Sequence, residues 1–192
     1  MNRPLQKIEA PATYQDVLDA PANMVAELVH GALHLHPRPT FRHGVVSSTL
    51  GFEVGVPFHR GRGGPGGWWI IDEPELHLGE HVLVPDLAGW RRERMPEPPE
   101  GVGVALEPDW VCEILSPGTR KFDLTGKRPI YGEAGVRHLW LIDPDARTLE
   151  AFANRDGAWT LLTALKDDDP VSVAPFDAIE FPLAALWGEE PA

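Results

Sequence analysis

The sequence predicts an α/β fold in which a central mixed β-sheet is flanked by helices. Apolar runs bounded by turn residues alternate with two stretches of helical periodicity. The central part of the chain follows the order helix, strands, helix, strand, which is typical of an α/β sandwich. A hairpin pattern stands at each end of this part, so we expect an N-terminal and a C-terminal β-hairpin as well.

The first elements are a short helix, a hairpin and a longer helix. Thr13 is a suitable N-cap for a helix over residues 13–19. Residues 24–36 predict a β-hairpin whose turn contains Gly31, since glycine tolerates the positive φ of a tight turn. A helix is expected over residues 43–56, where apolar residues recur at a spacing of four: Val46, Leu50 and Val54.

The middle of the chain predicts strands separated by a loop and a surface segment. Residues 60–67 are rich in glycine and predict a loop. Residues 68–72 predict a buried strand, and residues 81–90 a further strand region that contains Pro85. Residues 93–108 are rich in Pro and Glu and predict a surface excursion. The apolar run 109–115 predicts a central strand.

The C-terminal part predicts a helix, a strand and a hairpin. The helix is expected over residues 123–134 and the buried strand over residues 138–142. Residues 148–153 and 158–165 predict a hairpin. The remaining segment, residues 171–187, is expected to wrap the edge of the fold.

Length and composition are those of one globular domain. The chain has 192 residues, of which 43% are hydrophobic and 24% charged. We expect a loose tail over residues 1–12 and a single domain over residues 13–188. The single cysteine, Cys112, excludes an internal disulfide and a cysteine-based zinc site, and it favours a reducing compartment such as the cytoplasm. No stretch approaches the roughly 18 apolar residues of a membrane span.

The net charge of −12 counts against nucleic-acid binding, because contacts to phosphate need Lys and Arg. The net charge does not exclude such binding, since the carboxylates of a metal site add negative charge themselves. Local clusters of basic residues also remain, at residues 91–94 and 120–128.

Two acidic residues, Asp86 and Glu113, stand inside or beside apolar strands. A buried carboxylate usually has a cationic partner or a metal, because desolvation of the charge costs several kcal/mol. Two acids on neighbouring strands can converge on one hard cation, and Mg²⁺ and Mn²⁺ favour oxygen ligands. The alternative is that each acid pairs with an arginine or caps a turn, and composition alone does not decide between the two interpretations.

Other candidate residues have simple structural explanations when they are taken alone. Glu27 fits a surface position on an edge strand, and His43 an exposed position at a helix N-terminus. His34 and His36 alternate on one strand and share a face, so they could hold zinc if a third ligand joined them. Lys127 lies four residues after Asp123 and four before Tyr131, so a helix would place these three side chains on one face.

Together, these residues resemble a known family. The resemblance is carried by Pro85-Asp86-Leu87, by the segment 111–119, by Asp123, Lys127 and Tyr131, and by the segments 135–136 and 139–144. It extends to Tyr14, to the hairpin segment 27–31 and to His43. The pattern is similar to the Uma2 family of restriction-endonuclease-like proteins, once catalogued as a domain of unknown function, within the PD-(D/E)XK nuclease superfamily. The resemblance covers about residues 14–187.

The resemblance implies a restriction-endonuclease-like fold and a metal site. Asp86 and Glu113 would ligate Mg²⁺ or Mn²⁺, with Glu27 as a further ligand and His43 nearby. The superfamily pattern has a lysine two residues after the second acid, but this chain has Leu115 there. The family's solution implies that Lys127, on the following helix, takes this place, with Lys121 as the second choice.

These residues support three hypotheses. The first is a Mg²⁺- or Mn²⁺-dependent endonuclease that acts on nucleic acid, with DNA as the expected substrate and Asp86, Glu113, Lys127 and His43 as catalytic residues. The second is a catalytically inactive binding or assembly module on the same fold, which the acidic net charge and Leu115 favour. The third is a zinc site on His34 and His36. Exposed apolar edges near the C-terminal hairpin also suggest a homodimer.

Overall fold

A computed structural model describes residues 11–188. The predicted tail over residues 1–12 therefore lies almost entirely outside the described residues. Within the described part, no helix is both long and apolar enough to cross a membrane.

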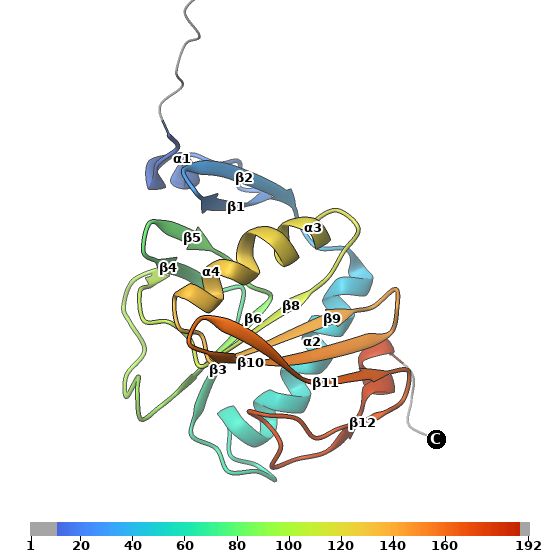
Figure 1. Ribbon diagram of the computed structural model, residues 1–192. Coiled ribbons are helices and arrows are strands. Elements are labelled where there is room, and N and C mark those ends of the chain that lie inside the picture. The colour runs from blue at the N-terminus through green and yellow to red at the C-terminus, as the bar shows by residue number, and fades with distance from the viewer. Residues whose placement is uncertain (1–10, 189–192) are drawn as a thin grey trace, which may run out of the picture.

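The centre of the molecule is a mixed six-stranded sheet (Figure 1). Its strands, from one edge to the other, are β11 (Ala158–Lys166), β10 (Thr148–Arg155), β9 (His138–Asp143), β8 (Trp110–Ile114), β6 (Leu87–Arg91) and β3 (Trp68–Asp72). β8 and β9 run parallel, and the other neighbours are antiparallel. The predicted mixed sheet is confirmed, and the segment 109–115 does supply a central strand.

A second sheet of five strands packs beside the first. Its order is β2 (Ala32–Pro37), β1 (Met24–Val29), β5 (His81–Leu83), β4 (Glu75–Leu78) and β7 (Gly103–Val104). The predicted N-terminal hairpin forms its edge, and the turn residues His30 and Gly31 have φ values of 50° and 70°. A third, two-stranded sheet joins β12 (Pro170–Val171) to β13 (Phe181–Pro182).

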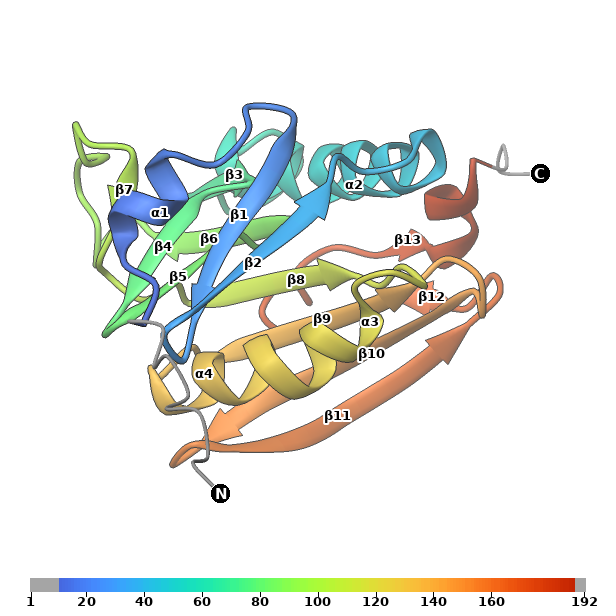
Figure 2. The ribbon, with the colours of Figure 1, turned by 90° about the horizontal axis from the view of Figure 1, so that it is seen from above.

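Helices cover both faces of the six-stranded sheet (Figure 2). One face carries α2 (Phe41–Val54), its π-helical continuation η1 (Gly55–His59) and the 3₁₀ helix η3 (Leu183–Trp187). The other face carries a continuous helical segment made of α3 (Arg120–Phe122), the π-helical turn η2 (Asp123–Lys127) and α4 (Arg128–Glu133). The short α1 (Tyr14–Leu18) begins after Thr13, as predicted.

Alternation along β8 separates two hydrophobic clusters. Trp110, Cys112 and Ile114 pack in the cluster that includes the apolar residues of α2, whereas Val111 packs in the cluster that includes those of α4. Since successive side chains of a strand point to opposite faces, Glu113 lies on the same face as Val111. Its carboxylate is therefore directed towards the helical segment η2–α4.

The structure corrects several predicted boundaries. The region 81–90 is not one strand, because Val84, Pro85 and Asp86 separate β5 in the five-stranded sheet from β6 in the six-stranded sheet. Proline has no N–H for the ladder, so the chain can change sheets at this point. Strand β4 was not predicted, and the surface excursion over residues 93–108 contains the short strand β7. Both long helical segments begin earlier than predicted, at Phe41 and Arg120.

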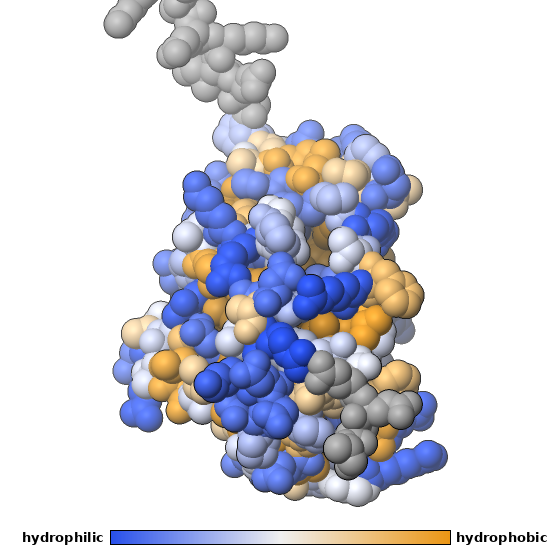
Figure 3. All heavy atoms as spheres, turned by 90° about the vertical axis from the view of Figure 1, so that its right-hand side faces the viewer, coloured by the Kyte–Doolittle hydropathy of each residue, from blue (hydrophilic) through white to orange (hydrophobic). Residues whose placement is uncertain are grey.

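The C-terminal hairpin is confirmed, and it leaves β11 at the edge of the six-stranded sheet. Leu161 and Leu162 on this strand are exposed, as are Phe41 and Phe52 near the two ends of α2. Figure 3 shows a different view of the surface, in which hydrophobic side chains are interspersed with hydrophilic ones. The homodimer was predicted from an exposed apolar edge near this hairpin, and such an edge is present. The dimer itself stays a prediction.

Candidate active site

All five predicted site residues line one cavity of about 430 Å³. It lies where the two large sheets meet the N-terminus of α2 and the turn η2. The polar residues that matter for its chemistry are Glu27, His36, His43, Asp86, Glu113, Asp123 and Lys127. Asp123 was not among the predicted site residues, and His36 was predicted only as a zinc ligand together with His34. The spacing of four between Asp123 and Lys127 was the signal that could have identified the former.

Asp86 is held at the point where the chain passes from one sheet to the other. Its Oδ2 accepts a hydrogen bond of 2.6 Å from the backbone N–H of Ile114 at the end of β8. Its Oδ1 lies 3.1 Å from Nε2 of His43. The break in strand pairing at Pro85 therefore lets this carboxylate turn towards β8, and both its oxygens have fixed partners.

Glu113 is more deeply buried than Asp86, with 2% of its surface exposed. Its Oε1 accepts hydrogen bonds of 2.6 Å from the Tyr131 hydroxyl and 2.8 Å from the Lys127 ammonium. Burial raises the pKa of Glu113 well above its ordinary value, and the charge of Lys127 only partly opposes this effect. The predicted common face of Asp123, Lys127 and Tyr131 is confirmed, because all three side chains meet at this carboxylate or at its lysine.

Lys127 is buried among acceptors. Its Nζ lies 2.8 Å from Oε1 of Glu113, 3.1 Å from Oε1 of Glu27 and 3.0 Å from the carbonyl oxygen of Val84. Burial lowers the pKa of Lys127, but the carboxylates of Glu113, Glu27 and Asp123 outweigh burial and raise it above the ordinary value. Lys127 is therefore charged at neutral pH. Lys121, the second choice from the sequence, is exposed and does not line this cavity.

Glu27 is buried, which the sequence alone did not indicate. It has 2% of its surface exposed, and its Oε1 accepts a 2.8 Å hydrogen bond from the backbone N–H of Val84. Its Oε2 lies 3.4 Å from Nε2 of His36. The interpretation of Glu27 as an exposed edge-strand residue is thus wrong, because β1 lies between β2 and β5 and Lys127 of η2 packs against this carboxylate.

His43 lies in the first turn of α2 and is half-buried. Its Nε2 contacts Oδ1 of Asp86 and the carbonyl oxygen of Ile114, both at 3.1 Å. Burial lowers the pKa of His43, but the hydrogen bond and charge of Asp86 outweigh burial and raise it. Its Nδ1 is buried and has no hydrogen-bond partner within residues 11–188. The expectation of a surface histidine is wrong.

His34 and His36 share a face, as predicted, but no zinc site forms around them. Both rings lie against the ring of Phe122, at centroid distances of 4.4 and 5.0 Å. Within residues 11–188, no group of three His, Cys, Asp or Glu side chains with ligand atoms within 4.8 Å of one another includes either histidine. The structure therefore gives no support to the zinc hypothesis at this pair.

The cavity holds more negative than positive charge. Four carboxyl groups face it from Glu27, Asp86, Glu113 and Asp123, and Lys127 is the ammonium among them. Arg38 and Glu73, which also line the cavity, pair with each other at 3.4 Å. An excess of buried carboxylates suits a hard divalent cation with oxygen ligands. No three of these carboxylates come within 4.8 Å of one another in the described residues, so a Mg²⁺ or Mn²⁺ ion here would keep several waters, as Mg²⁺ commonly does.

Asp123 gives a direct test of this charge excess. Burial raises its pKa to about 6, despite the opposing charge of Lys127. Because the folded pKa lies above the unfolded value of 3.8, ionisation costs folded-state stability as the pH rises from about 4 to above 6. We expect Asp123→Asn to raise the free energy of unfolding at pH 8 by up to about 3 kcal/mol in metal-free buffer. The gain should be largely absent at pH 4, and denaturant unfolding at both pH values would measure it.

Comparison with known proteins found a family model and a solved structure that match this chain. The chain matches the model of the Uma2 family, described as "Putative restriction endonuclease", over residues 11–184. A solved crystal structure from Anabaena variabilis, described as a "putative nuclease belonging to DUF820", has the same fold, with a TM-score of 0.75 and 23% sequence identity. The similarity covers 93% of this chain and 98% of that chain. No curated protein matches the sequence. The family match spans nearly the whole chain, and the protein therefore belongs to the Uma2 family.

Proposed function

We propose that this protein is a metal-dependent nuclease that hydrolyses phosphodiester bonds of nucleic acid, with DNA as its substrate. The observation that carries the proposal is the meeting of Asp86, Glu113 and Lys127 in one acidic cavity. The membership of a family described as restriction endonucleases supports the same reaction class. In this proposal Asp86 and Glu113 hold Mg²⁺ or Mn²⁺, and Glu27 and Asp123 add negative charge that favours a divalent cation.

The cation supplies a Lewis acid that lowers the pKa of water and offsets negative charge on the phosphate. The protein supplies the position of each ligand. The Ile114 N–H and His43 Nε2 fix the two oxygens of Asp86, while Tyr131 and Lys127 hold Oε1 of Glu113. His43 serves here as a positioning residue, because its Nε2 is occupied and its Nδ1 is buried. The Lys127 ammonium offsets charge that develops on the phosphate.

A catalytically inactive module is the second candidate, and one observation favours it. An ammonium has three N–H donors, and Nζ of Lys127 already has three acceptors within 3.1 Å, in Glu27, Glu113 and Val84. It therefore has no donor left for water or phosphate unless one of these contacts is exchanged. In the nuclease, Lys127 would exchange one of these contacts for the phosphate, whereas in the inactive module Lys127 would keep all three.

The test uses supercoiled plasmid and single-stranded DNA as substrates, with RNA as a third. We expect cleavage with Mn²⁺ or Mg²⁺, none with EDTA, and none for the double variant Asp86→Asn/Glu113→Gln under any condition. Thermal unfolding of the same samples should show stabilisation by Mn²⁺ in the wild type and not in the double variant.

The two measurements separate the candidates. Stabilisation by Mn²⁺ without cleavage of any of the three substrates would favour the inactive module. Equal cleavage by the wild type and the double variant would contradict the assignment of the site, because a contaminating nuclease would explain it.

A further inference from the structure

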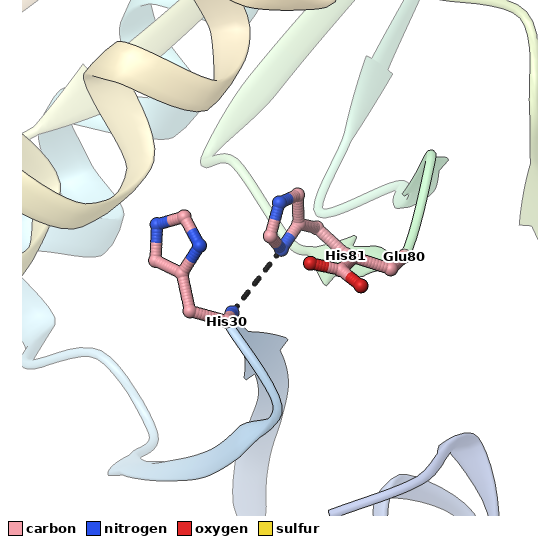
Figure 4. Close-up of side chains that lie close together, drawn as sticks. All are labelled: His30, Glu80 and His81. Atoms are coloured by element: carbon pink, nitrogen blue, oxygen red, sulfur yellow. Dashed lines mark hydrogen bonds between the residues drawn. The ribbon is translucent and has the colours of Figure 1, made fainter. Parts of the chain in front are cut away.

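A second cluster of possible ligands lies at one end of the five-stranded sheet, outside the cavity described above. It consists of His30 in the turn between β1 and β2, Glu80 in the turn between β4 and β5, and His81 at the start of β5 (Figure 4). β1 and β5 are antiparallel neighbours paired at Leu28 and Val82. His30 lies two residues after Leu28, and Glu80 lies two residues before Val82. The antiparallel pairing therefore brings His30 opposite Glu80.

Two tight hairpin turns form the backbone at this cluster. His30 has a φ of 50° and, with Gly31, makes the turn between β1 and β2. Gly79, which precedes Glu80, has a φ of 64°, so both hairpins turn tightly beside each other.

The side chains converge. The ligand atoms of His30, Glu80 and His81 all lie within 4.8 Å of one another. Within residues 11–188, no other group of three His, Cys, Asp or Glu side chains comes this close together. The two imidazole rings are nearly perpendicular, with centroids 4.7 Å apart. Nδ1 of His81 accepts a 3.2 Å hydrogen bond from the His30 backbone N–H (Figure 4), so His81 would have to exchange this bond for the cation to present the same lone pair to it.

We propose that His30, Glu80 and His81 form a surface site for a borderline divalent cation, with Zn²⁺ as its metal. Two imidazoles and one carboxylate are a ligand set that zinc uses when it keeps a fourth position open for water or another molecule. His30 and Glu80 are exposed and His81 is partly so, which leaves that fourth position accessible. The site differs in chemistry from the carboxylate-rich cavity around Asp86, which suits hard cations. It does not depend on the proposed nuclease activity.

Zinc at this position would fasten two strands that also build the acidic cavity. Glu27 on β1 and Val84 after β5 are already joined by a 2.8 Å hydrogen bond. Ligands from the turn after β1 and from the start of β5 would add a second connection between the same elements. We therefore expect Zn²⁺ to raise the temperature of unfolding of the whole domain, by an amount that increases with the logarithm of the ratio of free Zn²⁺ to its Kd.

The experiment titrates Zn²⁺ into protein without a histidine tag, by calorimetry, and follows Co²⁺ binding by its visible absorption. All proteins carry Asp86→Asn, which removes an oxygen ligand from the other cavity. His30→Asn removes one imidazole while keeping a residue type that tolerates positive φ. Glu80→Gln removes the exposed carboxylate without affecting the core. His34→Asn is the matched control, since His34 lies on the same hairpin but outside the cluster.

We expect one Zn²⁺ per chain, and a loss of affinity in His30→Asn and Glu80→Gln that exceeds the roughly 10- to 100-fold effect of removing a residue that only holds a ligand in place. The control His34→Asn should bind as the parent protein does. Equal affinity in the parent and His30→Asn would overturn the proposal, as would weaker binding in His34→Asn alone. Failure of the nuclease assay would leave this result untouched, because no arm of the titration measures cleavage.

Discussion

Replacing Lys127 by methionine is expected to lower the free energy of unfolding by about 3–5 kcal/mol at pH 8, the usual cost of breaking a buried ion pair by removing one partner. Methionine fills a similar volume, so the loss reflects charge more than packing. Glu27 and Glu113 would remain buried without the ammonium that lies 3.1 and 2.8 Å away from them. Urea unfolding of the metal-free protein would measure the effect.

Two comparisons make this prediction specific. Lys121→Met removes an exposed lysine from the same helical segment and should change stability little. The double variant Lys127→Met/Glu113→Gln should recover part of the loss, because it also removes one unpaired carboxylate. If Lys127→Met and Lys121→Met cost the same, Lys127 is not the counter-ion of the buried acids.

The pH dependence of Lys127→Met should be distinctive. Glu113 has a raised pKa even beside Lys127, and Asp123 has a pKa of about 6. Without the lysine, both acids should take up protons more readily and lose their charge at higher pH. The stability difference between the wild type and Lys127→Met should therefore shrink as the pH falls from 8 to 5.

Replacing Asp86 by asparagine is expected to reduce metal-dependent cleavage of DNA at least about 100-fold while the fold is retained. Asparagine is close in shape to aspartate, and its amide oxygen can still accept the N–H of Ile114. It cannot supply the charge that a divalent cation requires. Rates of plasmid nicking in Mn²⁺, with thermal unfolding as a check on the fold, would measure both parts of the prediction.

The same variant has a readout that does not depend on catalysis. The bond and charge of Asp86 raise the pKa of His43, so Asp86→Asn should lower it. NMR titration of the His43 ring in metal-free protein would detect the change. Asp145→Asn is the matched control, because Asp145 is exposed, does not line the cavity and pairs with Arg42 at the surface. An unchanged pKa for His43 in Asp86→Asn would show that the two side chains are not in contact.

Periodicity and turn residues were enough to predict the local elements, and the sequence also singled out several residues that line the cavity. The hairpin of β1 and β2, the helix with Val46, Leu50 and Val54 on its buried side, and the central strand β8 follow from periodicity and turn residues. These patterns depend on neighbours within a few positions, so they can be read without the fold. Asp86 and Glu113, which stand inside or beside apolar strands, were also expected to converge, and both line the cavity.

Tertiary structure alone decided where those residues meet. Glu27 seemed an exposed edge residue, yet it is buried because the segment after β5, 57 positions away, covers it and donates the Val84 N–H. His30 meets His81 only through the pairing of β1 with β5. Such contacts depend on strand register between distant segments, and a shift of one residue would direct each side chain to the opposite face. For that reason, spacing along the chain could not predict the contacts of Lys127 with Glu27, Glu113 and Val84. It could not predict the proposed zinc ligands either, since they meet only in the folded structure.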